Sequence, residues 1–193
     1  MPNRQKNASF VEKKPYGKNY GNLSYIFLPH LQTKLQPMKN IYFPDEEITR
    51  DDVFFVCSLI ERTARSLKQP NRYVANSMGV QALRETLSLA NVLHSENPEA
   101  VTARLIERYR LEKGHFDVSD VNPEYCPQIP TPLDMGKVYM RLVLSTLQPD
   151  EDYAQAIIRV YNHPICKTLD NYNASGYYEP SYYITRSYYN GTF

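Results

Sequence analysis

The chain contains no tryptophan and only three cysteines among its 193 residues. The thiols of Cys57, Cys126 and Cys166 cannot form an even disulfide framework, and unpaired thiols are typical of a reducing compartment. No apolar run approaches the roughly 18 residues that a membrane-spanning helix needs, and the N-terminal region lacks the apolar stretch of a signal peptide. We therefore expect a cytoplasmic protein with no membrane partner.

Short motifs of common catalytic and nucleotide-binding sites are also missing. The chain has no G-x-x-x-x-G-K-[ST] phosphate loop, no G-x-G-x-x-G fingerprint, no G-x-S-x-G nucleophile elbow and no C-x-x-C pair. These absences remove the strongest sequence arguments for an enzyme and for a cofactor. We expect no cofactor, and the sequence favours a non-enzymatic function while leaving the enzyme alternative open.

The net charge of +1 argues against a general nucleic-acid binder, but the charges are unevenly distributed. Residues 1–40 carry seven basic side chains against one acidic one, so that segment is near +6 and the remainder near −5. A basic arm on an acidic body can fold back on that body or bind an acidic partner. A solvated basic tail is the plainer interpretation.

Apolar residues recur at helical spacing from Thr49 onward, with capping residues and prolines at the expected boundaries. Thr49, Asn97 and Thr131 are the expected N-caps, and Gly79 separates a short turn or helix at 71–77 from the helix that follows it. Further helices are expected from Pro149, near 164–172 and near 180–189.

The pattern predicts a mainly α protein, a single-domain bundle of about six to eight helices with little or no sheet. Residues 1–48 are expected to form an extended or partly disordered basic arm that wraps the body, and residues 49–193 the helical domain. Extended structure is indicated only at 24–28 and 115–118.

Two pairs of His and Cys residues are the candidates for metal or redox chemistry. His163 and Cys166 are three residues apart, and with His115 and Cys126 they would supply the four ligands of a zinc site. A buried Cys166 and a His163 that caps a helix start are the structural alternative. We predict no metal, with His163 and Cys166 as the weak candidates.

Catalytic candidates are equally few. Cys126, in an irregular proline-rich loop, is the most plausible nucleophile, and it would need His115 within hydrogen-bond reach. His94 ends an apolar helix, where it can interact with the negative end of the helix dipole or face a partner or an active site.

The C-terminal segment is unusually aromatic: residues 172–193 hold seven of the chain's 17 tyrosines, and only Glu179 and Arg186 are charged. Their rings suit core packing, a partner surface, or base stacking with single-stranded nucleic acid. The predicted partner-binding residues are Tyr177, Tyr178, Tyr182, Tyr183, Tyr188 and Tyr189. Helical spacing puts Tyr178, Tyr182 and Tyr189 close to one face and Tyr177, Ile184 and Tyr188 on another.

The stretches IERTARSL (60–67) and LANVLHSENPEAVTARLIERYRL (89–111) resemble a small uncharacterised bacterial helical family. The matching positions are Ile60-Glu61 and Val92-Leu93-His94, within residues 54–111. Members of that family are thought to be encoded beside ADP-ribosyltransferase-like proteins of mobile elements. The resemblance implies an accessory or neutralising partner and carries no catalytic residues.

These observations favour a non-catalytic protein-interaction or accessory factor, antitoxin-like, of a bacterial or mobile-element system. Two alternatives stay open. One is a small enzyme or metal-dependent factor that uses the His and Cys residues, and the other is a nucleic-acid-binding protein that uses the basic arm and the C-terminal tyrosines.

Overall fold

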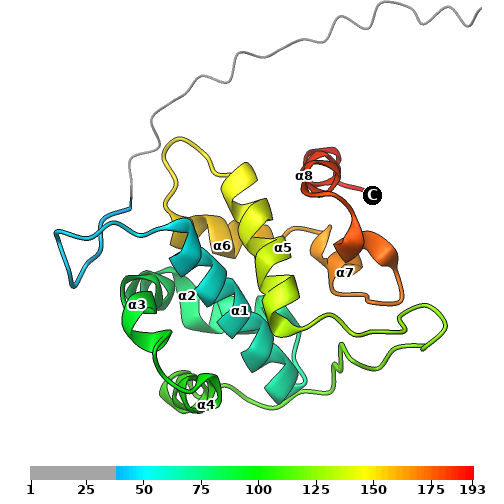
Figure 1. Cartoon of the computed structure of the whole chain (residues 1–193), viewed down its shortest axis with the longest axis horizontal. Coiled ribbons are helices and arrows are strands. Elements are labelled where there is room, and N and C mark those ends of the chain that lie inside the picture. The colour runs from blue at the N-terminus through cyan, green and yellow to red at the C-terminus, as the bar shows by residue number, and fades with distance from the viewer. Residues whose placement is uncertain (1–37) are drawn as a thin grey trace, which may run out of the picture. The chain divides into compact units, whose positions relative to one another are not determined.

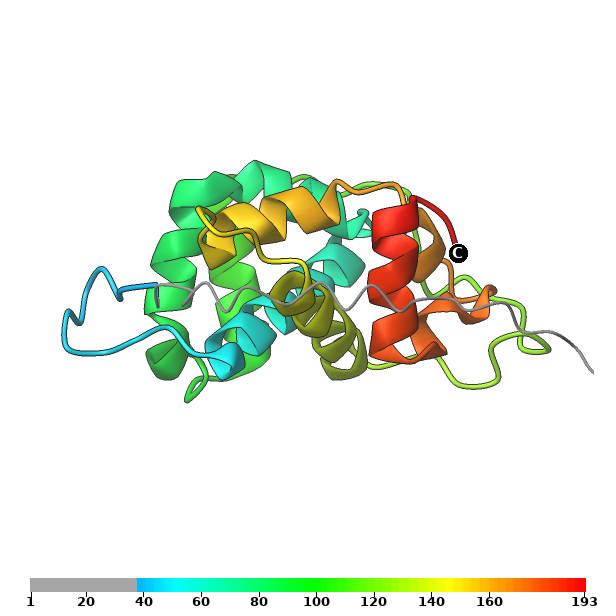
Figure 2. The same ribbon diagram turned by 90° about the horizontal axis from the view of Figure 1, so that it is seen from above.

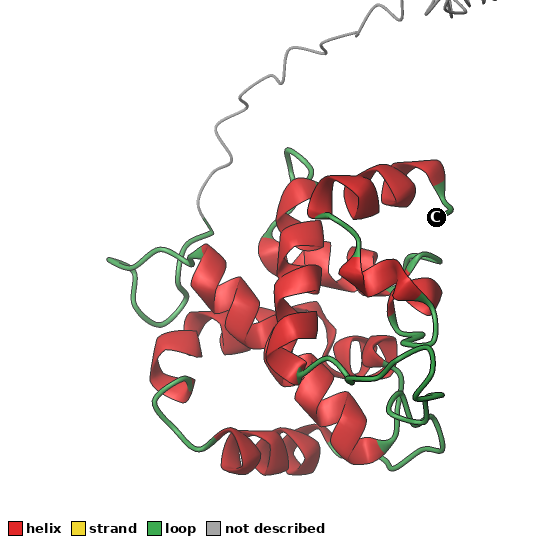
Figure 3. Ribbon diagram, turned by 45° about the vertical axis from the view of Figure 1, so that its right-hand side comes forward, coloured by secondary structure: helices red, strands yellow, loops and turns green. Residues whose placement is uncertain are grey.

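The computed structural model describes residues 38–193, and this part of the chain is built from α-helices joined by irregular loops (Figure 1, Figure 3). It holds no strand, and its one isolated antiparallel bridge joins Lys39 and Glu47. The helices are α1 (Arg50–Leu67), α2 (Asn71–Ser88), α3 (Ala90–Leu93), α4 (Pro98–Tyr109), α5 (Pro132–Ser145), α6 (Tyr153–Tyr161), α7 (Cys166–Leu169) and α8 (Ser181–Asn190), with a 3₁₀ helix η1 (Ser175–Tyr178). The predicted mainly α fold is confirmed.

Three predicted helix starts are confirmed in atomic detail. Thr49 and Thr131 both form capping boxes, with Asp52 and Asp134 as the third residues of α1 and α5. Asn97 caps α4 by accepting hydrogen bonds from the Glu99 and Ala100 backbone N–H groups. These starts depend only on residues two or three positions apart, so the local sequence specifies them.

Other boundaries differ from the pattern. At Gly79 the backbone has φ 70° and ψ 172°, so α2 consists of two helical segments joined at a kink, as the predicted break there implies. The helix expected from Pro149 begins later, because Asp152 caps it through Gln155. Residues 115–118 form irregular loop rather than extended sheet, and η1 was not predicted.

The core lies where α1 crosses α5, with α2 and α6 packed alongside (Figure 1, Figure 2). The crossing of α1 and α5 is close because Gly136 faces Ser58. A Cβ atom at position 136 would lie 2.9 Å from the Ser58 Cα atom. Only glycine allows this approach, which brings the apolar faces of the two helices together.

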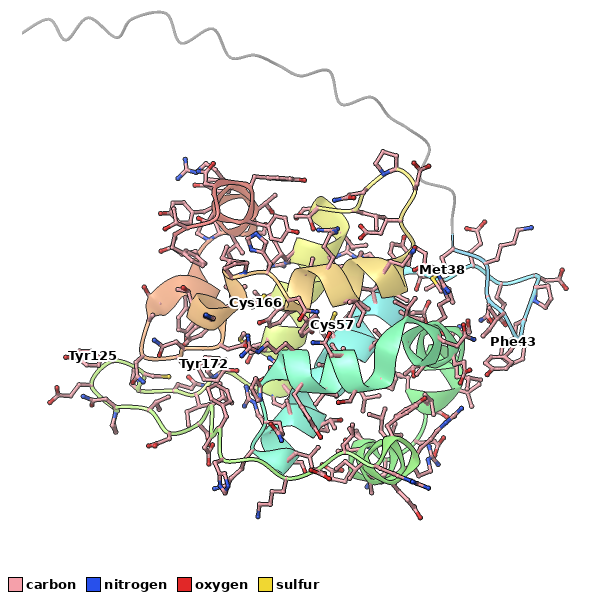
Figure 4. The ribbon with its side chains drawn as sticks, turned by 180° about the vertical axis from the view of Figure 1, so that it is seen from behind. Met38, Phe43, Cys57, Tyr125, Cys166 and Tyr172 are labelled. Carbon is pink, nitrogen blue, oxygen red and sulfur yellow. The ribbon has the colours of Figure 1, made fainter. Side chains whose placement is uncertain are left out.

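Residues 38–48, the described part of the predicted arm, form a loop fastened to the end of α2. The Asn40 side chain donates to the Ser88 carbonyl oxygen at 2.8 Å, and the Ser88 hydroxyl accepts from the Ile41 backbone N–H at 3.1 Å. Ile48 is buried, whereas Phe43 lies at the exposed outer side of the loop (Figure 4). The rest of the arm, residues 1–37, lies outside the described residues.

Among the helices of residues 38–193, none combines the length and the apolar character that crossing a bilayer requires.

Candidate functional site

A polar network is buried between α1, α2, α5 and the segment that follows α7. Its centre is Glu61, which is 1% exposed. One carboxylate oxygen of Glu61 accepts from Arg65 Nε at 2.6 Å and from the Tyr172 hydroxyl at 2.7 Å, and the other accepts from Asn71 Nδ2 at 2.5 Å. Arg65 Nη2 also donates to the Tyr172 hydroxyl at 2.8 Å, so every partner of Glu61 is held in turn.

Asp170 is the second carboxylate of this network. Its Oδ1 atom accepts from Asn71 Nδ2 at 3.1 Å and from the Tyr139 hydroxyl at 2.5 Å. Asn71 therefore bridges the two acids. Arg65 forms an ion pair with Glu61, and no ion pair within the described residues neutralises Asp170.

Burial and the nearby Glu61 carboxylate raise the pKa of Asp170 to about 7, although the hydrogen bonds from Tyr139 and Asn71 act in the opposite direction. Charged carboxylates are costly away from water unless they are paired. Asp170 is consequently able to gain or lose a proton near neutral pH, which a surface aspartate does not do.

The outer edge of the network opens into a cavity of about 460 Å³. Its walls come from the start of α2, the segment 116–120, the turn between α6 and α7, and the segment after α7. Asp170 and Tyr172 lie in the wall together with Phe116, while Arg72 and Lys167 are exposed lining residues.

Two stacked tyrosines lie beside the network, with ring centroids 4.3 Å apart. The Tyr139 hydroxyl is bonded to Asp170, but the Tyr161 hydroxyl, next to the Cys57 thiol, is buried without a hydrogen-bond partner. It is the only such buried side-chain oxygen or nitrogen in residues 38–193.

Burial raises the pKa of the Cys57 thiol, which excludes it as a ready nucleophile.

The four candidate zinc ligands, His115, Cys126, His163 and Cys166, do not assemble into a metal site. No three His, Cys, Asp or Glu side chains in the described part of the chain are arranged to hold a metal ion. The Cys166 thiol donates to the Val160 carbonyl oxygen at 3.0 Å, and burial raises its pKa. The centroids of the His163 and Tyr188 rings are 4.0 Å apart, and His163 Nδ1 accepts a hydrogen bond from the Ile165 N–H at 3.3 Å. Both contacts are those of a structural histidine at a helix start.

The catalytic candidates also lie in structural surroundings. Cys126 is buried, its thiol donates to the Gln128 carbonyl oxygen at 3.3 Å, and it lies 3.5 Å from the Tyr177 hydroxyl. His115 is exposed and makes no side-chain hydrogen bond within the described residues. His94 is exposed at the end of α3, where its ring meets the edge of Phe55 at 5.9 Å.

The six C-terminal tyrosines divide into buried and exposed members. Tyr177 and Tyr188 are 6% and 9% exposed and belong to the core, and Tyr183 is half-buried. Tyr178, Tyr182 and Tyr189 are 68%, 72% and 67% exposed. The helical spacing puts Tyr177 and Tyr188 on a different face from Tyr178, Tyr182 and Tyr189. In the structure the first face is buried and the second is exposed.

Two of these exposed tyrosines, Tyr182 and Tyr189, lie on α8. Tyr182, Arg186 and Tyr189 are four and three residues apart and share one face of the helix. Beside this aromatic stripe, a groove of about 370 Å³ runs between α5 and the η1–α8 segment. Tyr178 and Ile129 line the groove and leave large apolar surfaces open to water.

The buried network was not predicted from the sequence. Glu61 appeared only as part of the family resemblance, and Asp170 had no assigned role. The available signal was weak: Glu61 falls on the apolar face of α1, one turn before Arg65, where a charged residue requires a partner.

No family model, curated protein or solved structure is detectably similar to this chain. The resemblance to the bacterial helical family therefore stays a prediction.

Proposed function

We propose that this protein is a non-catalytic interaction factor that binds another protein through the aromatic stripe on α8 and the adjoining groove. The observation that carries the proposal is the exposure of Tyr182 and Tyr189 on α8 and of Tyr178, which lines the groove. Tyrosine and arginine are enriched at protein interfaces because they bring large contact areas with polar tips.

The charges around the groove indicate the chemistry of the partner. Lys137 and Arg141 on α5 line the groove and are exposed, and neither forms an ion pair within residues 38–193. Of the acids that line it, Asp134 is held by its capping box with Thr131, which leaves Glu179. An acidic segment with an apolar or aromatic anchor would complement this surface.

The thiols and histidines give less support to the enzymatic alternative. Cys57 and Cys166 have raised pKa values through burial. The buried Cys126 thiol contacts the Gln128 carbonyl oxygen and the Tyr177 hydroxyl, and no histidine of the described residues is hydrogen-bonded to it as the base that thiol catalysis requires.

Exchange of Tyr182 and Tyr189 to serine tests the surface directly. The matched control is Tyr125→Ser, because Tyr125 is 69% exposed at the outer end of a different loop (Figure 4). A partner identified by crosslinking from position 182 is purified and titrated with each protein. We expect the double variant to weaken binding at least tenfold, since each interface tyrosine contributes about 1–2 kcal/mol, and the control to bind normally.

Two outcomes would contradict the proposal. In one, the double variant and the Tyr125 control bind the purified partner equally well. In the other, the full chain captures nucleic acid instead of protein, with an affinity that falls steeply with salt.

The narrower form of the proposal is an antitoxin-like role in a bacterial or mobile-element system, as the family resemblance implies. Co-expression with a growth-inhibiting protein encoded beside this chain would then restore growth, and the double tyrosine variant would not. If the wild type and the double tyrosine variant both restored growth, the neutralising contact would lie outside the aromatic stripe.

A further inference from the structure

The cavity beside the buried network has an unmet hydrogen-bonding and charge requirement at its inner end. Asp170 Oδ1 has two donors, whereas Oδ2 has none among the described residues. Among residues 38–193, the Tyr161 hydroxyl is the only fully buried side-chain polar atom that lacks a hydrogen-bond partner. Because Asp170 Oδ2 lacks a donor as well, it is not fully buried, and solvent reaches it. Because Asp170 lines the cavity, that solvent lies in the cavity.

The mouth of the cavity has the opposite character. Arg72 and Lys167 line it, are exposed, and form no ion pair with residues of the described part of the chain. Asp117, which also lines the cavity, is already paired with Lys68 at 3.1 Å. The exposed Asp120 reduces the positive charge at the mouth and makes no ion pair with any residue in the range 38–193.

Between these two ends one part of the wall is apolar, and the polar side chains of Asn162, His163, Asn171 and Asn173 form much of the rest. Phe116 is 43% exposed, and Val118, Pro70 and Pro164 continue the same lining. A few polar groups that converge on an apolar concave wall are typical of small-molecule sites.

We propose that this cavity binds a small zwitterionic amine: its cationic ammonium group meets Asp170, and its carboxylate lies between Arg72 and Lys167. The ammonium supplies the charge that the network lacks and the hydrogen-bond donors that Oδ2 accepts. The hydrocarbon part of the ligand lies along Phe116 and its apolar neighbours. This site is separate from the α8 stripe and does not depend on the proposed partner.

Binding of the ammonium group requires Asp170 to be ionised. The titratable groups that surround Asp170 are Glu61 and Arg65 from α1, Tyr139 from α5, Tyr161 from α6, Cys166 from α7, and Tyr172. Asp117, Asp120 and His163 line the same cavity, and burial and the nearby Arg159 lower the pKa of His163, so that it is neutral at pH 8. The tyrosines and Cys166 have raised pKa values and stay neutral at pH 5–8, and Arg65 stays charged. Since burial raises the pKa of Asp170 to about 7, affinity for the amine should fall below neutral pH.

The experiment uses the full chain and three matched probes, 6-aminohexanoate, hexylamine and hexanoate, titrated while backbone amide NMR signals of residues 161–173 are followed. At pH 8 we expect the zwitterion to bind most tightly, hexylamine more weakly and hexanoate not at all. Between pH 8 and pH 5.5 the affinity for both amines should fall at least tenfold.

Variants separate the two ends of the site. Asp170→Asn keeps an oxygen acceptor for Tyr139 and should weaken both amines at least tenfold, whereas Asp150→Asn, at an exposed aspartate outside the cavity, is the control and should not. Exchange of Arg72 and Lys167 to glutamine, both exposed, should make 6-aminohexanoate bind no better than hexylamine. The comparison with the Arg72 and Lys167 variant remains informative even if Asp170→Asn folds poorly.

Binding of hexanoate as strong as that of the amines would overturn the assignment of the inner end. Equal binding by the wild type and Asp170→Asn would overturn it as well, as would the absence of shifts with any probe at pH 8. Because the α8 tyrosine variants leave this cavity intact, they should bind 6-aminohexanoate normally, so failure of the partner proposal and failure of this one are distinguishable.

Discussion

Gly136 shows how one residue sets a helix crossing in this protein. An added methyl group at this position meets the Ser58 side chain and backbone, and backbone atoms of a core helix cannot move aside. We expect Gly136→Ala to lower the free energy of unfolding by about 3 kcal/mol, measured by urea denaturation. The neighbouring Lys137→Ala, at an exposed position, should change it by less than about 0.5 kcal/mol. Equal effects of the two substitutions would show that the crossing is not close.

The stacked tyrosines make a second prediction at the residue scale. Tyr139→Phe removes a donor to Asp170 and should destabilise the protein at pH 8 by about 2 kcal/mol, because hydrogen bonds to charged groups are the stronger ones. Tyr161→Phe removes a hydroxyl that has no partner and should leave stability unchanged or raise it by about 1 kcal/mol. Denaturant unfolding of the two variants tests the contrast, and a larger loss for Tyr161→Phe would contradict it.

At the scale of elements, Arg159 joins α6 to α8 and to the loop between α5 and α6. Its guanidinium donates twice to Glu151, at 2.7 and 2.6 Å, and also to the Thr146 carbonyl oxygen at 2.8 Å and the Tyr188 hydroxyl at 2.5 Å. A lysine cannot reproduce this planar fork. Since Tyr188 is one of the few buried residues of α8, the arginine fixes that helix and the aromatic stripe on its outer face.

Arg159→Lys should therefore loosen α8 locally. We expect hydrogen exchange of the α8 amides to accelerate at least tenfold while α1 amides exchange as before, because local opening needs less free energy than global unfolding. Arg104→Lys is the control, because Arg104 makes a similar two-bond pair with Glu96 on an exposed surface. Acceleration throughout the protein, or none in α8, would show that Arg159 does not hold this helix specifically.

At the scale of the whole molecule, the buried network makes stability depend on pH. An aspartate in the unfolded chain titrates near pH 4, while Asp170 in the folded protein titrates near 7. Between these values the folded state holds a proton that the unfolded chain has released, so stability falls as pH rises from about 4 to about 7 and is constant above. We expect the free energy of unfolding to fall by about 2 kcal/mol over this range. This is less than the full pKa shift of Asp170 implies, because solvent in part reaches Asp170.

Urea denaturation at pH 5 and pH 8 measures this effect. Asp170→Asn, which cannot ionise, should remove most of the difference, and Asp120→Asn should keep it. Asp117 acts in the opposite direction: hydrogen bonds from Ser119 and Lys68 lower its pKa to about 2, so its contribution is present above pH 4 and is lost as pH falls through 2. His163, whose pKa is lowered by burial and by Arg159, acts in the opposite direction within this range. A difference between pH 5 and pH 8 that is the same in the wild type and in Asp170→Asn would therefore contradict the assignment.

The sequence by itself determined the class of the fold and most helix starts. Thr49, Asn97 and Thr131 cap their helices through residues two or three positions away, and the apolar spacing along α1 and α5 defines their buried faces. It also divided the C-terminal tyrosines into two faces. These features follow from local geometry, because capping and helical periodicity involve only neighbouring turns.

Only the tertiary structure decided which face of the tyrosine segment is buried and which chemical groups meet. The hydrogen bond from Tyr172 to Glu61 joins residues 111 positions apart, and Asn71 reaches Asp170 across 99. Within the described residues, the four candidate zinc ligands are not brought together. Contacts at such separations are selected by the packing of whole helices against one another, and no short-range pattern in the chain encodes that packing.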